Sequence, residues 1–147
     1  MKDFKHTIKY SVLLSAVLIL FSCSSNPEKS GKLLDSGVEF YYHAQYKKAF
    51  VLFKKALDAD ESNFEAWFWM GNYFENSHDN VRSIECYTKA IELNPNYADA
   101  YANRALSKKN LHDDAGACAD WKKAAKLGKA NLDDKLEWCR RNKIGDK

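Results

Sequence analysis

Residues 64–97, FEAWFWMGNYFENSHDNVRSIECYTKAIELNPNY, form one complete unit of a pattern that recurs along the chain. The small residues Gly37, Gly71 and Ala105 stand 34 positions apart. Four further columns of like side chains keep this interval: Leu33, Trp67 and Tyr101; Ala49, Ser83 and Ala117; Phe53, Tyr87 and Trp121; Ala56, Ala90 and Ala124. Columns at a fixed period indicate a stacked repeat array. Such an array forms a curved surface suited to holding another polypeptide.

The apolar spacing predicts two amphipathic helices in each unit. In the first helix of the central unit, Trp67, Gly71 and Phe74 lie at i, i+4 and i+7 and form one stripe. The small residue lets the partner helix approach closely, because no side chain stands between the two backbones. The second helices place an aromatic residue between two small ones, which predicts a ring packed between narrow neighbours.

Turn chemistry predicts where these helices begin and end. Asp79 or Asn80, and Asp113 or Asp114, are positioned to cap the second helices by accepting backbone N–H bonds. Pro95 ends the helix before it, since proline lacks the N–H donor and disfavours helical geometry in the preceding residue.

A further helix is predicted over about residues 132–141, after Gly128, which suits a C-cap. It places Leu132, Leu136 and Cys139 on one face. Terminal repeats need an element that covers their exposed apolar side, and this helix provides one.

At this point the sequence resembles the tetratricopeptide repeat family. The central unit, 64–97, carries the family's pattern throughout, and units 30–63 and 98–131 repeat it in register, followed by a capping helix and tail over 132–147. The third unit departs from the pattern at Arg104, Lys108 and Lys129. The resemblance implies an all-α fold, a right-handed α-solenoid of three repeats plus a C-terminal capping helix.

The resemblance also implies a concave side lined by the first helix of each unit. Counting about 100° per residue from Trp67 identifies the sector turned away from the packed stripe. The candidate partner-binding residues in this sector are Val38, Tyr41, Tyr42, Phe68, Trp69, Asn72, Asn103 and Leu106. We expect the asparagine amides to bond a ligand's main chain while the aromatic rings hold side chains. The expected ligand is a protein or peptide of apolar or mixed character.

Two alternatives compete with this interpretation. Phe68 and Leu34 fit a core role better than a contact role, because stacked arrays bury part of the same sector. The segment 27–32 could also fold over Trp69 and leave no free site.

One sub-class of the family binds acidic C-terminal tails through a clamp of basic residues and asparagines. The resemblance puts the clamp positions at Leu34, Val38, Trp69, Asp99 and Asn103, where the clamp needs Lys, Asn, Asn, Lys and Arg. This chain therefore lacks the clamp, which favours an apolar or mixed ligand.

The N-terminal stretch predicts export. Lys2, Lys5 and Lys9 precede a nearly unbroken apolar run over 12–21, which is too short to span a bilayer but suits a signal-peptide core. The following Ser22-Cys23 resembles a bacterial lipoprotein signal. The resemblance implies removal of residues 1–22, acylation of Cys23, and a tether over 23–29. The alternative is an ordinary secretory signal with a coincidental cysteine.

These features predict a lipid-anchored protein of the bacterial cell envelope, on the periplasmic or outer-membrane side. Removal of 1–22 takes away three lysines and one aspartate and lowers the formal charge from +3 to +1. So balanced a chain has no broad field to attract nucleic acid or anionic lipid, so neither is an expected partner.

The remaining cysteines carry little information. Cys86, Cys118 and Cys139 show no metal-binding spacing, and we expect them to be buried free thiols. The alternative is that Cys118 and Cys139 pair in an oxidising envelope.

No catalytic motif is present, and we expect neither an enzyme nor a cofactor. GxSxG, a phosphate-binding glycine loop and HExxH are all missing from the sequence. His78-Asp79 and His112-Asp113 repeat at the 34-residue interval and could in principle bind a metal, but turn and capping chemistry explains them better.

The expected function is that of a scaffold or adaptor. The runners-up are a permanent subunit of an envelope complex, and a regulator or inhibitor of a secreted enzyme.

Overall fold

The computed structural model describes residues 25–144, which contain seven α-helices and no strand. The all-α fold predicted from the sequence is confirmed. The predicted signal peptide and Cys23 lie outside the described residues. The helices are α2 (Pro27–Tyr42), α3 (Tyr46–Ala59), α4 (Phe64–Asn76), α5 (Asn80–Leu93), α6 (Ala98–Asn110), α7 (Asp114–Lys126) and α8 (Asp133–Arg141).

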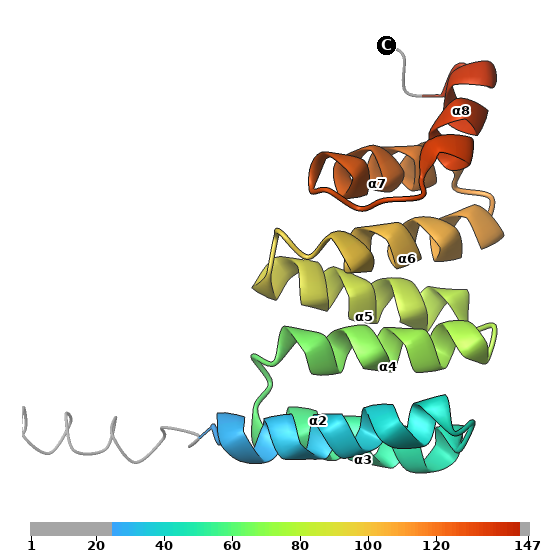
Figure 1. Cartoon of the computed structure of the whole chain (residues 1–147). Coiled ribbons are helices and arrows are strands. Elements are labelled where there is room, and N and C mark those ends of the chain that lie inside the picture. Colours follow the sequence, from blue (N-terminus) through green and yellow to red (C-terminus); the bar gives the residue numbers. More distant parts are fainter. Residues whose placement is uncertain (1–24, 145–147) are drawn as a thin grey trace, which may run out of the picture.

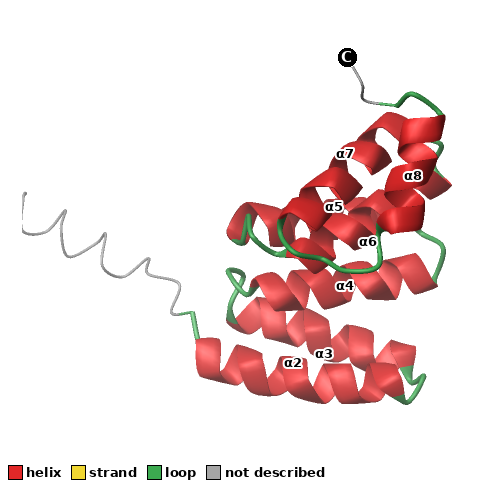
Figure 2. Ribbon diagram, turned by 45° about the horizontal axis from the view of Figure 1, so that its top comes forward, coloured by secondary structure: helices red, strands yellow, loops and turns green. Residues whose placement is uncertain are grey.

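The helices form three antiparallel hairpins that stack into a solenoid, with α8 beside α7 at the C-terminal end (Figures 1 and 2). The pairs are α2–α3, α4–α5 and α6–α7. Helix α4 also contacts both α2 and α6, whereas α3, α5 and α7 do not contact one another. The first helices of the units are therefore drawn together, and their shared side is the inner side of the stack.

Each of the first two hairpins closes by packing an aromatic ring against a glycine. Phe53 and Tyr87 are fully buried. A Cβ added to Gly37 would lie 2.6 Å from Phe53 Cε1, and one added to Gly71 would lie 2.5 Å from Tyr87 Cε1. In the third unit Ala105 and Trp121 share one buried cluster. The predicted packing of rings between small residues is thus confirmed.

The turns inside the hairpins repeat as regularly as the core. Ala44, His78 and His112 have φ values of 55°, 60° and 62°. Asp79 caps α5 by accepting from Arg82 N at 3.0 Å, and Asp113 caps α7 by accepting from Gly116 N at 2.9 Å. The histidines and aspartates that repeat in the sequence are therefore turn and capping residues.

The tether predicted over 23–29 is wrong in its second half, because α2 already begins at Pro27. Asn26 caps this helix by accepting from Lys29 N at 2.9 Å, and its own N–H donates to Ala59 O at 2.7 Å. Ser30 is fully buried and donates to Ala56 O at 2.9 Å. The first turns of α2 thus pack against the end of α3 and do not fold over Trp69.

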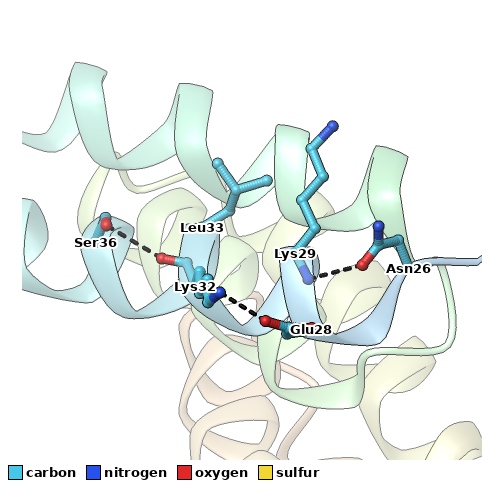
Figure 3. A pocket seen from close by; sticks show the side chains of 6 residues that line it. All are labelled: Asn26, Glu28, Lys29, Lys32, Leu33 and Ser36. Carbon is cyan, nitrogen blue, oxygen red and sulfur yellow. Dashed lines mark hydrogen bonds and ion pairs between the residues drawn. The ribbon is translucent and has the colours of Figure 1, made fainter.

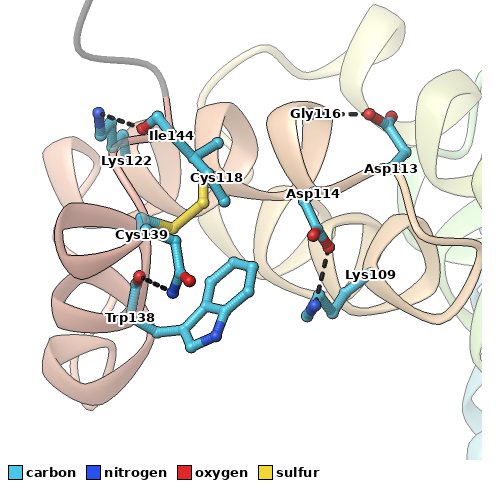
Figure 4. Close-up of a disulfide and its surroundings, with 10 residues drawn as sticks. Lys109, Asp113, Asp114, Gly116, Cys118, Lys122, Trp138, Cys139 and Ile144 are labelled. Atoms are coloured by element: carbon cyan, nitrogen blue, oxygen red, sulfur yellow. Dashed lines mark hydrogen bonds and ion pairs between the residues drawn. A yellow bond between two sulfur atoms is a disulfide. The ribbon is translucent and has the colours of Figure 1, made fainter.

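The expectation of free thiols is wrong for two of the three cysteines. Cys118 of α7 and Cys139 of α8 form a disulfide, with their Cα atoms 5.9 Å apart (Figure 4). The chain turns back after Lys126, so that Leu132, just before α8, and Leu136 and Cys139 on one face of α8 pack on α7. Cys86 is a free, buried thiol, and burial raises its pKa to about 12.

The third unit replaces an apolar contact with charges. Arg104 donates to both carboxylate oxygens of Asp120 at 2.8 Å, and Lys108 pairs with the same carboxylate at 2.8 Å. Asp120 is only 5% exposed. The equivalent positions of the second unit, at the 34-residue interval, are Met70, Phe74 and Cys86. Two of the three departures from the repeat pattern, Arg104 and Lys108, thus form one mutually compensating group with Asp120, whereas Lys129 pairs with Asp99.

We predict that Gly71→Ala lowers the free energy of unfolding by about 1–3 kcal/mol, because its Cβ would overlap the Tyr87 ring. Helix propensity alone predicts the opposite sign, a gain of up to about 1 kcal/mol. Gly31→Ala is the control, since nothing lies within 4 Å of its added Cβ. Urea unfolding followed by circular dichroism compares the two variants. Equal or greater stability of Gly71→Ala would contradict the packing argument.

We predict that Asp120→Ala lowers the free energy of unfolding by about 3–5 kcal/mol, because it leaves Arg104 and Lys108 partly buried without their anion. The triple variant Arg104→Met, Lys108→Phe and Asp120→Leu replaces all three charges with apolar side chains. It is expected to match or exceed the wild type, since well-packed apolar groups often replace buried ion pairs without loss. The thermal unfolding midpoints of the two variants and the wild type test both predictions. A triple variant as unstable as Asp120→Ala would refute the explanation.

Candidate functional site

A hollow of about 440 Å³ lies on the inner side of the stack. Helix α4 provides the largest share of its lining, and α2 and α6 provide the two sides. The lining residues, which we call the inner groove, are Tyr41, Tyr42, Trp69, Asn72, Glu75, Asn76 and Asn103. They gather there because residues three or four apart share one helix face, and the three first helices lie side by side.

Three aromatic rings form one wall of the inner groove. The Trp69 ring centroid lies 5.4 Å from that of Tyr41 and 5.6 Å from that of Tyr42, both in edge-to-face geometry. Trp69 also stacks on the core residue Phe53 at 6.2 Å. Tyr42 is 75% exposed, whereas Tyr41 and Trp69 are half-buried. The wall is thus anchored in the core and leaves one ring almost wholly open to a partner.

The polar part of the groove is organised by Asn72. Its side-chain oxygen Oδ1 accepts from Asn103 Nδ2 at 2.9 Å and lies 2.8 Å from the Tyr87 hydroxyl. Its backbone oxygen accepts from the Tyr41 hydroxyl at 3.2 Å. These contacts fix the orientation of both amides. Within residues 25–144, Asn72 Nδ2 and Asn103 Oδ1 make no hydrogen bond and remain available to a ligand.

The inner groove carries a negative charge. The Tyr87 hydroxyl lies 2.7 Å from Glu75 Oε2. Burial raises the pKa of Tyr87 well above its usual range, and the Glu75 carboxylate raises it further. Burial, Tyr46 and the same carboxylate raise the pKa of Tyr41. Both phenols are therefore neutral hydrogen-bond donors, and the Glu75 charge acts directly on the groove.

The structure brings together five of the eight candidate residues predicted from the sequence: Tyr41, Tyr42, Trp69, Asn72 and Asn103. Phe68 is 8% exposed and packs between Tyr87 and Tyr97, so it is a core residue and is corrected as a groove candidate. Val38 packs against the core cluster that contains Leu34 and Phe53. Leu106 is 41% exposed and lies outside the lining.

The sequence analysis missed Glu75 and Asn76. Counting about 100° per residue places them near 80° and 180° from Trp67, inside the sector that was searched. The signal was therefore present. The candidates were aromatic, apolar or amide residues, so the Glu75 carboxylate was not among them. Its contact with a hydroxyl of the neighbouring helix α5 could not be read from helical counting.

A second hollow, of about 470 Å³, lies on the outer face of α2 (Figure 3). Its polar groups already bond one another: Lys32 Nζ pairs with Glu28 at 2.6 Å, and Ser36 Oγ donates to Lys32 O at 3.1 Å. All of these side chains are strongly exposed. The hollow is thus a solvated helix surface and offers a ligand less than the inner groove.

Other kinds of site are not found in the described part of the chain. Residues 25–144 contain no cluster of three or more side chains suited to a metal ion. None of their helices has both the length and the apolar character needed to span a bilayer.

Comparisons with known proteins agree with this architecture. The TPR repeat family model matches residues 81–111. RNA polymerase II-associated protein 3 of Xenopus tropicalis is 31% identical over 116 residues, which cover 74% of this chain but only 17% of that protein. The photosystem I assembly protein Ycf3 of Acaryochloris marina is 22% identical, with 89% of each chain covered.

Among solved structures, the first TPR of Spaghetti (RPAP3), bound to the HSP90 peptide SRMEEVD, superposes with a TM-score of 0.77. It is 19% identical, and the match covers 82% of this chain and 98% of that one. The helix pairs and the inner groove define an α-helical repeat array with an open hollow on its inner side. The fold is that of a tetratricopeptide repeat solenoid, and residues 81–111 match the model of the repeat.

Proposed function

We propose that this protein is a lipid-anchored scaffold of the bacterial cell envelope that holds a partner polypeptide in the inner groove. The observation that carries the proposal is the open aromatic wall of Tyr41, Tyr42 and Trp69 beside two unsatisfied amide groups. Peptides are commonly recognised by aromatic side chains that hold the peptide's side chains, next to polar groups that bond its main chain. The module itself carries out no chemistry; it positions one protein next to a membrane.

The disulfide supports an extracytoplasmic location. Disulfides persist in oxidising compartments such as the bacterial periplasm and are rare in the cytosol. The Cys118–Cys139 bond lies between two helices and ties the capping helix to the last repeat. The disulfide and the predicted signal sequence are independent features, and both agree with export from the cytosol.

The position of α2 supports a short anchor. If Cys23 is acylated, only Ser24 and Ser25 separate it from the Asn26 cap. Three extended residues reach about 10 Å, so the repeats would lie close to the lipid headgroups.

We predict that a photo-crosslinking residue in place of Tyr42 captures a discrete partner in native membranes, and that the same residue in place of Val51 does not. Val51 is the matched control because it is 48% exposed on α3, away from the inner groove. With the crosslinking residue moved to the exposed groove position Asn76, Tyr42→Ala should lower the yield of captured partner about tenfold, the loss expected when an aromatic anchor is removed. Capture at Val51 alone would refute the groove.

Sizing of the captured species in mild detergent distinguishes a scaffold from a permanent subunit. An exchanging scaffold is found both free and bound, whereas a permanent subunit migrates only in a large assembly. Exclusive migration in the assembly would replace the scaffold proposal by the subunit one.

We predict that Cys23→Ser releases the protein from membranes, because the acyl chains on Cys23 would be its anchor. Fractionation and metabolic labelling with a radioactive fatty acid measure the change. Cys86→Ser is the control, since its thiol is buried in the fold. Membrane retention of Cys23→Ser, or labelling that survives the substitution, would contradict lipid anchoring.

A further inference from the structure

We infer that the inner groove selects a partner segment carrying a lysine or arginine side chain, which pairs with Glu75 and lies against the rings of Tyr42 and Trp69. This inference rests on the proposed function and names the chemistry of the ligand that the groove would hold.

The first observation is an unpaired carboxylate. Glu75 lines the groove and is half-buried, and within residues 25–144 it forms no ion pair. Tyr87 contacts only Oε2, so Oε1 and further lone pairs remain free. A partly desolvated charge without a partner is unfavourable, and a cation supplied by a ligand offsets that cost.

Among residues 25–144, no cation pairs with Glu75 or lines the groove. None of the seven groove-lining residues is Lys, Arg or His. On α6, Lys109 pairs with Asp114 at 2.7 Å and lies 4.0 Å from the Trp138 ring centroid, as Figure 4 shows. Lys47 and Lys48 border a separate hollow that shares only Asn76, and neither pairs with Glu75. The charge is thus left for a partner.

The second observation is the aromatic wall next to this carboxylate. A cation over the face of Trp or Tyr is attracted by the ring quadrupole. The aliphatic stem of a lysine or arginine packs on the same rings while its charged head stays in a polar environment. The open Tyr42 ring and the half-buried Trp69 ring provide these surfaces within one hollow that also contains Glu75.

The third observation indicates that the cation belongs to a polypeptide. Asn72 Nδ2 offers a donor and Asn103 Oδ1 an acceptor, which match the carbonyl and N–H groups of a main chain. A free inorganic cation would have no use for the amide donor, and it has no aliphatic stem to pack on the rings.

The same groups disfavour an acidic tail. A carboxylate placed here would meet the like charge of Glu75. Asp99, at one of the positions where the acidic-tail clamp needs a basic residue, is acidic and pairs with Lys129. The ligand chemistry is therefore the opposite of the acidic type.

The test is selection from a phage-displayed library of random heptapeptides on the full chain, immobilised in detergent. Wild type is expected to enrich peptides with Lys or Arg at one position, flanked by apolar residues. Glu75→Gln keeps the size of the side chain and its capacity to accept from Tyr87, and it should lose this preference. Glu85→Gln, an exposed position on α5, is the matched control and should enrich the same peptides as wild type.

A direct measurement follows with an enriched peptide and its counterpart in which neutral citrulline replaces arginine. Wild type should bind the arginine peptide about tenfold more tightly, a difference of 1.4 kcal/mol. Glu75→Gln should bind both equally. Circular dichroism confirms that each variant is folded.

The outcomes separate the two proposals. Enrichment of acidic or wholly apolar peptides, or equal binding of arginine and citrulline peptides to wild type, overturns the cation inference and leaves the groove as a binding site. If wild type enriches peptides no better than a folded Trp69→Ala variant does, both the cation inference and the groove as a binding site are overturned.

Discussion

The close approach of an aromatic ring to a residue without a side chain determines this structure. Phe53 on Gly37 and Tyr87 on Gly71 bring the helices of each hairpin so near that a Cβ would not fit between them. Both hairpins close in the same way, and α4 contacts α2 on one side and α6 on the other. Tyr87 has a second role, since its hydroxyl contacts Glu75 and Asn72. The ring that closes the central hairpin therefore also organises the candidate binding surface.

The C-terminal part of the array is stabilised differently from the rest. In the third unit the Arg104–Asp120–Lys108 group takes the place of an apolar contact, and Arg104 also donates to Thr88 of α5 at 3.0 Å. A disulfide and the edge-to-face contact of Trp121 with Trp138 then fix α8 on α7. Charged groups and a covalent bond thus stabilise the third repeat and its contact with α8.

The sequence was sufficient for the fold because the repeat places equivalent residues at a fixed interval, and the helix caps at Asp79 and Asp113 follow local rules. The sequence was insufficient for features that depend on the distance between two helices. The Cys118–Cys139 bond depends on how α8 folds back, and the start of α2 depends on a contact between Asn26 and Ala59. For the groove, helical counting identified five of the residues that line it. Whether Phe68 faced the core, and what Glu75 contacted, depended on the neighbouring helix.

The central claim is that packing buries the rings of Phe53 and Tyr87 on the second helices and leaves Tyr42, with part of Tyr41 and Trp69, accessible to a partner on the inner helices. Hydrogen–deuterium exchange of the full chain, with and without the captured partner, tests it most directly. The account predicts that the partner slows exchange over the C-terminal halves of α2 and α4 and around Asn103 of α6, and leaves α3, α5 and α7 unchanged. Protection confined to α3, α5 and α7 would contradict it.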